Sequence, residues 1–272
     1  MLAPAIIPGA FWNWNRSQKA PDGPEPWHRI RSSQRPLARW IRRRRTAIPG
    51  IALRWIGPFG FQENSPTRSY EYPWCFHALP IVPRMSVVEI GAGLSGFQFV
   101  LSRAGAHVVS VDPLINPNPD VDWTFPEQDF RHLNRAFGTN VRFIRSTLQQ
   151  AALPAASLDR AYCISAMEHI PVTEIPPLLD EIRRILRPGA CLVLTVDLFL
   201  DCSPFTSKDH NQWGTNVPVA KLAEAVGFSL VQGNREEIYG YPEFRTDTVL
   251  SRISEFLCHR GVLSQCAVFQ RC

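Results

Sequence analysis

One stretch, residues 86–112, constrains the fold most strongly. It begins with a short apolar segment, Val87 to Ile90, which runs without a polar linker into a glycine-rich turn. Three apolar residues then recur at the i, i+3 and i+4 spacing of a buried helix face (Phe97, Val100 and Leu101). Gly105 ends this predicted helix, and His107 to Val111 forms a second apolar segment. The order strand, glycine turn, helix, strand predicts an α/β fold with a doubly wound, mostly parallel sheet.

The glycine turn has the chemistry of a nucleoside-binding crevice. Gly91 lets the chain turn sharply off the strand, and Gly93 has no side chain, so a ligand can approach the backbone beside Ala92. The N-terminus of the following helix offers N–H groups that no helical carbonyl uses. Asp112 ends the second strand, where its carboxylate can accept hydrogen bonds from two adjacent ribose hydroxyls.

Glu89 separates the possible ligands of this turn. The glycine spacing followed by an acid also fits a dinucleotide-binding fingerprint, and a turn without any ligand stays open as well. A buried carboxylate two residues before Gly91 would repel a pyrophosphate and suits a cationic ligand. S-adenosylmethionine (SAM) carries a sulfonium and an ammonium group. The stretch resembles the first motif of the class I SAM-dependent methyltransferases.

Two later segments carry the same resemblance. Residues 158–170, LDRAYCISAMEHI, resemble the FDxVxxxxxxEHI segment of the small-molecule subfamily (methyltransferase type 11-like), with Leu158 in the aromatic position. Residues 186–196, LRPGACLVLTV, resemble the helix-turn-strand segment that follows it. The resemblance covers about residues 70–272. It implies a seven-stranded, Rossmann-like methyltransferase domain over residues 65–272, preceded by a basic extension rich in tryptophan and proline over residues 1–64.

The elements expected along this domain follow the apolar pattern. We expect helices over 128–137, 175–186, 217–226 and 246–259, and further strands over 141–144, 161–164, 191–196, 229–232 and 265–270. The last two strands match the antiparallel pair that closes the sheet in the family.

The resemblance also implies the residues of a SAM site. They are Tyr70, Glu89, Gly91, Ala92, Gly93, Asp112, Pro113, Thr147, Leu148 and Ser165. Tyr70 belongs to an aromatic patch that could shield the methionine end of SAM or simply pack between helix and sheet. Thr147 and Leu148 stand where the family usually carries an acid near the adenine, and no acid is present there.

His169 is the first candidate for a catalytic base and His210 the second. Methyl transfer to a hydroxyl or a protonated amine requires removal of a proton, and the unperturbed pKa of histidine suits neutral pH. His169 follows the predicted fourth strand by a few residues, although it could instead only orient the loop through hydrogen bonds. Histidines and carboxylates do not fall into metal-ligand spacing, so we expect no metal.

The extension carries the basic charge of the chain. The net charge is +5, and nine arginines without an acid lie between Pro26 and Gln62. The run Arg39–Arg45 could contact an anionic membrane surface or a phosphate-bearing substrate, or the extension could be a partly ordered cover of the domain. Nucleic-acid binding is not expected, because no nucleic-acid-binding module accompanies the arginines. Seven scattered cysteines and the lack of a signal peptide or an 18-residue apolar run favour a cytoplasmic protein.

Together these features predict an enzyme that uses SAM to methylate an oxygen or nitrogen atom of a small-molecule or glycan-like metabolite. An NAD(P)-dependent oxidoreductase and a non-catalytic binding protein of the same fold remain the alternatives.

Overall fold

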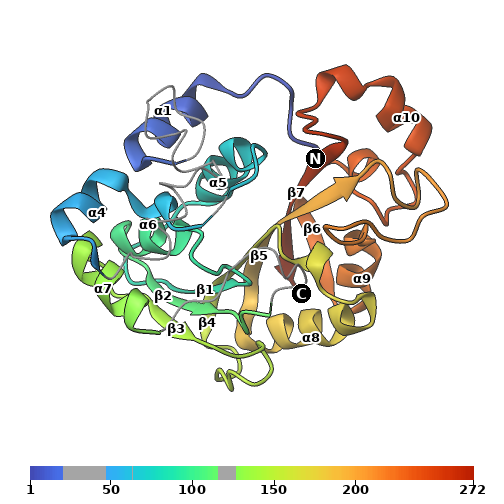
Figure 1. The fold of residues 1–272 in the computed structure, drawn as a ribbon. Helices are drawn as coiled ribbons and strands as arrows, with labels where there is room; N and C mark the ends of the chain where they lie inside the picture. The colour runs from blue at the N-terminus through green and yellow to red at the C-terminus, as the bar shows by residue number, and fades with distance from the viewer. Residues whose placement is uncertain (21–46, 63, 116–126) are drawn as a thin grey trace.

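The computed structural model describes residues 1–20, 47–62, 64–115 and 127–272. Their centre is one seven-stranded sheet (Figure 1). Its strands are β1 (Ser86–Ile90), β2 (His107–Val111), β3 (Arg142–Ile144), β4 (Leu158–Ile164), β5 (Leu186–Phe199), β6 (Phe228–Gln232) and β7 (Val262–Arg271). The strand order is β3-β2-β1-β4-β5-β7-β6. The fold class predicted from the sequence is confirmed.

The direction of each strand follows from its connections. Strands β1 to β5 pair in parallel, because helices or long loops carry the chain back between them. Strand β7 runs antiparallel to both β5 and β6. The strand order reverses beside β1, and ligands of open α/β sheets bind at such a point, outside the carboxyl ends of the strands.

The βαβ unit predicted from residues 86–112 is present with the expected boundaries. Helix α6 (Phe97–Arg103) follows the glycine turn, and Gly105, with a positive φ of 99°, leads the chain into β2. Val88 pairs with Val109 in the parallel ladder between β1 and β2. The central strands β1 and β4 are buried on both faces, which explains their largely apolar sequences.

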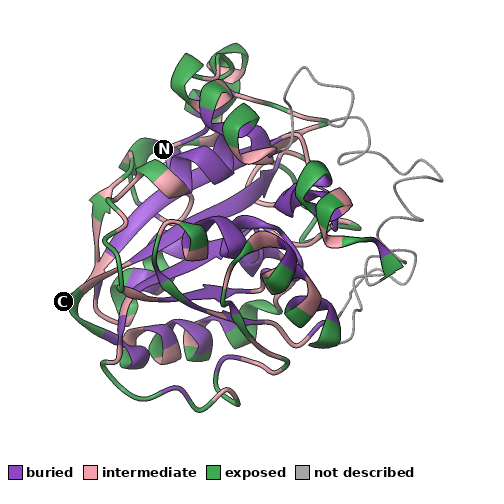
Figure 2. Ribbon diagram, turned by 90° about the vertical axis from the view of Figure 1, so that its left-hand side faces the viewer, coloured by how far each residue is buried: buried purple, intermediate pink, exposed green. Residues whose placement is uncertain are grey.

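Helices cover both faces of the sheet. On one face lie α8 (Ile175–Ile185) and α9 (Val219–Ala225), packed on a core that includes Leu192 and Leu194 of β5. On the other face lie α5 (Arg68–His77), α6 and α7 (Glu127–Phe137), whose core includes Tyr72 and Phe99. Figure 2 shows the buried strands enclosed between these two layers.

The described parts of the N-terminal extension complete the second core. Helices α1 (Gly9–Gln18) and α4 (Gly50–Ile56) and the short 3-10 helix η2 (Pro58–Gly60) bury Trp14, Leu53 and Phe59. The first residues reach the far edge of the sheet, where Leu2 forms a bridge with Gln265 of β7. A division of the chain at residue 64 into independently folding parts stays a prediction. The run Arg39–Arg45 lies outside the described residues.

One predicted helix is shorter than its sequence pattern indicates. Instead of spanning 246–259, helix α10 (Thr246–Ser251) is followed by the 3-10 helix η6 (Ile253–Glu255). The N–H group of Ala5 donates to the carbonyl of Glu255 over 2.7 Å, and the N–H group of Leu257 donates to that of Ala3 over 2.8 Å. Pairing with the N-terminal residues therefore holds the chain extended after Glu255. Strand β5 is longer than the predicted 191–196.

All seven cysteines are free thiols. Within the described ranges, no helix is both long and apolar enough to cross a membrane.

Candidate functional site

The glycine turn after β1 is closely packed by two neighbouring loops. Gly91 and Gly93 have φ values of +68° and +53°, which side chains disfavour. A Cβ atom at Gly91 would lie 2.6 Å from the Cβ of Ala166, and one at Gly93 would lie 2.4 Å from Oε1 of Gln62. The turn therefore requires glycine at both positions, and Ala92 between them is buried.

Asp112 is fixed by the turn that it faces. Its Oδ2 accepts a 2.7 Å hydrogen bond from the N–H of Gly93, and its Oδ1 accepts one of 2.6 Å from the N–H of Leu114. Burial raises the pKa of this carboxyl, and the two backbone hydrogen bonds oppose the rise. Each oxygen has a second lone pair, so a rigidly held carboxylate can still accept hydrogen bonds from two hydroxyls of a ligand.

Glu89 is a buried acid with one unsatisfied oxygen. Its side chain lies under the turn, 1% exposed, where Oε1 accepts a 3.0 Å hydrogen bond from the hydroxyl of Ser95. Oε2 has no hydrogen-bond partner among the described residues. Burial raises the pKa of Glu89 to about 8, the hydrogen bond from Ser95 opposes this, and the charge of Asp112 adds to it. Such a carboxyl suits a ligand that brings a positive charge.

The predicted adenine contacts lie beside Asp112. The N–H of Asp112 donates to the carbonyl of Ile144 over 3.2 Å, which joins the carboxyl ends of β2 and β3. Thr147 and the buried Leu148 follow that end of β3, and the half-buried Pro113 follows Asp112. Their contact with adenine stays a prediction.

Tyr70 faces the N-terminal helix. Its ring centroid lies 5.2 Å from that of Phe11 in α1. The neighbouring Tyr72 stacks on Phe97, the first residue of α6, with centroids 5.8 Å apart. Tyr70 therefore has a packing partner in Phe11, in line with the packing role that the sequence left open. Contact of Tyr70 with a cofactor stays a prediction.

A polar cluster lies at the carboxyl ends of β4 and β5, next to the glycine turn. We call Arg68, Glu71, Ser165, Glu168 and Asp197 the buried polar cluster. Arg68 forms an ion pair with Glu71 and donates a 2.6 Å hydrogen bond to Oγ of Ser165. The Ser165 hydroxyl lies 3.1 Å from Glu71, and Asp197 lies 4.0 Å from Arg68. Ser165 has a φ of +41°, so β4 ends in a sharp turn.

This cluster holds more carboxyl groups than cations. Glu168 accepts a 3.3 Å hydrogen bond at Oε1 from the N–H of Asp197, while its buried Oε2 has no partner within the described ranges. Burial raises the pKa of Glu168 to about 7. Burial, with the nearby charge of Glu168, raises the pKa of Asp197 well above its ordinary value. The cluster can therefore hold a proton near neutral pH or receive a positive charge.

His169 adjoins the cluster on the 3-10 helix η3 (Met167–His169). Its Nδ1 contacts the carbonyl of Trp213, and because a carbonyl only accepts, Nδ1 carries the proton in the neutral ring. Burial lowers the pKa of His169, and the charge of Asp197 opposes this. His169 is therefore neutral at physiological pH, the form that a base requires.

His210 lies in the loop that follows β5 and is exposed. This loop reaches η3 through a 3.0 Å hydrogen bond from the N–H of Thr215 to the carbonyl of Glu168. The two candidate bases thus belong to one region, but only His169 adjoins the buried polar cluster. In the described part of the chain, no group of three or more His, Cys, Asp or Glu residues is arranged to hold a metal ion.

Sequence reasoning missed Gln62, Arg68, Glu71 and Asp197. Gln62 accepts a 2.8 Å hydrogen bond from the N–H of Leu94, inside the glycine turn. A signal existed for two of them, because Arg68 and Glu71 have opposite charges and stand three residues apart. Asp197 stands within β5, close to its carboxyl end, where ligands of α/β sheets bind.

The methyltransferase domain family model matches residues 88–194. Among curated proteins, the sterol 24-C-methyltransferase of Yarrowia lipolytica is 30% identical over 168 residues, which are 57% of this chain and 42% of that protein. A second sterol 24-C-methyltransferase, ERG6B of Gibberella zeae, is 27% identical over 114 residues, 42% of this chain and 28% of that protein. The chain thus spans less than half the length of these relatives.

Solved structures share the fold. The [4+2]-cyclase SpnF has a TM-score of 0.52 and 13% identity, with 74% of this chain and 80% of SpnF covered. A SAM-dependent methyltransferase from Mesorhizobium loti has a TM-score of 0.50 and 15% identity, with 74% of this chain and 97% of that chain covered. The cyclase shows that this fold alone does not define a reaction.

The first motif, the strand order and the match of residues 88–194 to the methyltransferase domain model support the assignment of this region to the class I SAM-dependent methyltransferases. SAM, in place of a nicotinamide dinucleotide, is the cofactor that this assignment implies. The residues around the turn fit this cofactor. Glu89 offers an unsatisfied buried oxygen to a cation, and Asp112 presents two acceptors.

Proposed function

We propose that this chain transfers a methyl group from SAM to an oxygen or nitrogen atom of a small-molecule or glycan-like metabolite. The observation that carries the proposal is the position of His169 and the buried polar cluster immediately beside the glycine turn, through the contact of Ala166 with Gly91. Cofactor and proton-accepting groups would thereby share one end of the sheet.

SAM, when bound, supplies a methyl group activated by its sulfonium. Asp112 would hold the ribose hydroxyls, and Glu89 would face the positively charged methionine portion. Ser165 and Ala166 would form the wall between the cofactor and the acceptor. Fixing both reactants in this way lowers the entropic part of the barrier.

His169 would take the proton of the acceptor at Nε2, because Nδ1 carries the proton that faces Trp213. Asp197, whose charge raises the pKa of His169, would stabilise the imidazolium that forms. The loop 200–216, bonded to Glu168 through Thr215, would cover this proton transfer from water.

The test is methyl transfer from radiolabelled SAM to separate panels of amines, phenols and sugars. We expect turnover with one panel. His169→Gln should lower that turnover at least a hundredfold and still bind SAM. His107→Gln, which removes an exposed histidine on β2, is the matched control. If no panel is methylated although SAM binds, an oxygen or nitrogen acceptor is the wrong proposal.

Carbon is the second candidate for the acceptor atom. Both curated relatives are sterol 24-C-methyltransferases, and the buried polar cluster has three carboxyl groups for one arginine. An alkene carbon becomes positively charged when it gains a methyl group, and excess buried carboxylate would stabilise that charge. The same assay with a sterol that is unsaturated at C-24 distinguishes this candidate from the first.

We further propose, from the sequence, that Arg39–Arg45 contacts an anionic membrane surface or a phosphate-bearing substrate. Eight arginines between residues 29 and 45 without an acid support this proposal. Binding to anionic vesicles that weakens as salt rises, and that is lost when these arginines become glutamine, is the expected result. The free thiols support a cytoplasmic location as well.

A further inference from the structure

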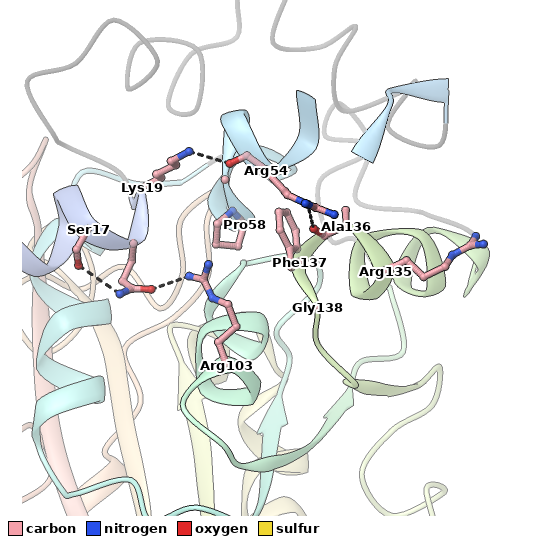
Figure 3. A pocket seen from close by; sticks show the side chains of 11 residues that line it. Ser17, Lys19, Arg54, Pro58, Arg103, Arg135, Ala136, Phe137 and Gly138 are labelled. Atoms are coloured by element: carbon pink, nitrogen blue, oxygen red, sulfur yellow. Dashed lines mark hydrogen bonds between the residues drawn. The ribbon is translucent and has the colours of Figure 1, made fainter. Parts of the chain in front are cut away.

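A cavity of about 460 Å³ opens between the C-terminal ends of α1, α4, α6 and α7 (Figure 3). Four cations line it, each from a different one of these regions: Lys19, Arg54, Arg103 and Arg135. None of the eleven described residues that line it is acidic. Figure 3 shows Arg103 reaching toward Pro58 and Phe137, while Arg135 extends away at the outer edge.

Three of these cations donate hydrogen bonds to neutral oxygens of the described residues. Lys19 donates from Nζ to the carbonyl of Arg54 over 2.8 Å, and Nε of Arg54 donates to the carbonyl of Ala136 over 2.8 Å. Arg103 donates to the side-chain oxygen of Gln18 over 2.6 Å. Neither Arg54 nor Arg103 forms an ion pair with a carboxylate of the described residues.

Helix ends explain part of this arrangement. Carbonyl groups at helix C-termini attract cations, so Lys19 stabilises the end of α4 and Arg54 the end of α7. Among the described residues, Arg103 donates to no such helix-end carbonyl, only to the side-chain oxygen of Gln18. Burial lowers the pKa of its guanidinium, because the group loses water without gaining a carboxylate. The charge of Arg103 thus exceeds what the helix ends require.

We propose that this cavity binds a phosphate-bearing ligand, a phosphate or diphosphate ester. Lys19, Arg54 and Arg103 would hold its oxygens, since guanidinium groups pair with two phosphate oxygens at once. Pro58 and Phe137 offer an apolar wall to the organic part. The volume lies within the range of small-ligand sites. The site differs from the predicted SAM and acceptor sites and does not depend on methyl transfer.

The test is calorimetric titration of the full chain with inorganic diphosphate and with glycerol phosphate, at constant ionic strength and without SAM. We expect saturable binding that Arg103→Gln weakens at least tenfold. Arg16→Gln, which removes an exposed arginine of α1 outside the cavity, is the control of equal charge and should change affinity less than twofold. Equal weakening in both variants, or none in Arg103→Gln, would overturn the site and assign binding to general charge or to the arginines of 29–45.

A second variant keeps all four cations. Ser17 lines the cavity and is exposed, so Ser17→Glu introduces a negative charge without removing a buried group. It should also weaken diphosphate binding at least tenfold while the melting temperature without ligand stays close to that of the wild type. Unchanged affinity in this variant contradicts the proposal.

Vesicles identify the source of the phosphate group. Arg103-dependent binding of phosphatidic acid vesicles, absent with phosphatidylcholine, would assign a lipid headgroup if the soluble esters fail to bind. Arg103-dependent binding of the soluble esters would assign a free metabolite. If neither the esters nor the vesicles bind in an Arg103-dependent way, the cavity is no phosphate site.

Discussion

Replacement of Glu89 by glutamine should change how the stability of the protein depends on pH. The folded protein raises the pKa of Glu89 from 4.5 to about 8 because the side chain is buried. The folded state therefore binds this proton more tightly than the unfolded state. As pH rises from about 4.5 to about 8, the carboxyl must ionise inside the protein, and stability falls.

The size of the effect follows from the shift. Between pH 5 and pH 9, ionisation of Glu89 should lower the free energy of unfolding by about 4 kcal/mol. Glu89→Gln cannot ionise, so this loss is absent from the variant. A buried amide without a partner beside Ser95 costs about 1–3 kcal/mol, but equally at every pH. Only the change with pH is therefore informative.

The assay is urea unfolding of both proteins at pH 5, 7 and 9 without SAM. From pH 5 to pH 9, the free energy of unfolding of the variant should increase relative to that of the wild type by about 4 kcal/mol. Glu236→Gln, at an exposed position, is the control and should follow the wild type. Parallel pH curves for Glu89→Gln and wild type would refute the argument that Glu89 is buried without a counter-ion.

Three further substitutions test other parts of the site. Asp112→Ala should weaken SAM binding at least tenfold, because charge-assisted hydrogen bonds are worth about 1.5–3 kcal/mol each; calorimetry with SAM checks this, and unchanged affinity places the ribose elsewhere. His169→Ala should lower turnover about 10²–10⁴-fold while the affinity for SAM is kept. Burial lowers the pKa of His169, so the acid limb of the wild-type pH–rate profile should lie below the ordinary histidine pKa of about 6.5. Turnover of His169→Asn within about threefold of the wild type would show that His169 only orients the loop. Trp14→Ala should cost about 3–5 kcal/mol in unfolding experiments because Trp14 is 6% exposed, whereas Trp55→Ala, at 62% exposure, should cost far less; similar losses would contradict the role of α1 in the core.

Local pattern was sufficient wherever the structure is local. The strand, turn, helix and strand of residues 86–112 have the predicted boundaries because apolar spacing and glycines act within one short stretch. The closing pair β6 and β7 was found in the same way. The helix predicted over 246–259 was too long because its end depends on Ala3 and Ala5, about 250 residues earlier in the chain.

The buried polar cluster could not be read from spacing. Glu71, Ser165 and Asp197 come from three segments that only the folded sheet brings together. Ser264 of β7, from a fourth segment, also donates a hydrogen bond to Glu71. Among these residues, the family resemblance of the sequence implies Ser165 as a site residue. The sequence alone gives no means of pairing that residue with a carboxylate 94 positions away.

Unsatisfied carboxyl oxygens lie on both sides of the contact between Gly91 and Ala166. Glu89 belongs to β1, Glu168 follows β4, and Asp197 lies near the carboxyl end of β5. Burial raises the pKa of all three. Each such acid destabilises the protein when it ionises alone. A cation bound near these acids would be stabilised by their carboxylates, because buried charges are not screened by water. Binding of the cation would in turn favour the ionised forms of the acids. Uptake of a positively charged ligand should therefore release protons near neutral pH and stabilise the fold at the same time. A pyrophosphate in the same place would instead be repelled, which would give a preference for SAM a cause on both sides of this contact.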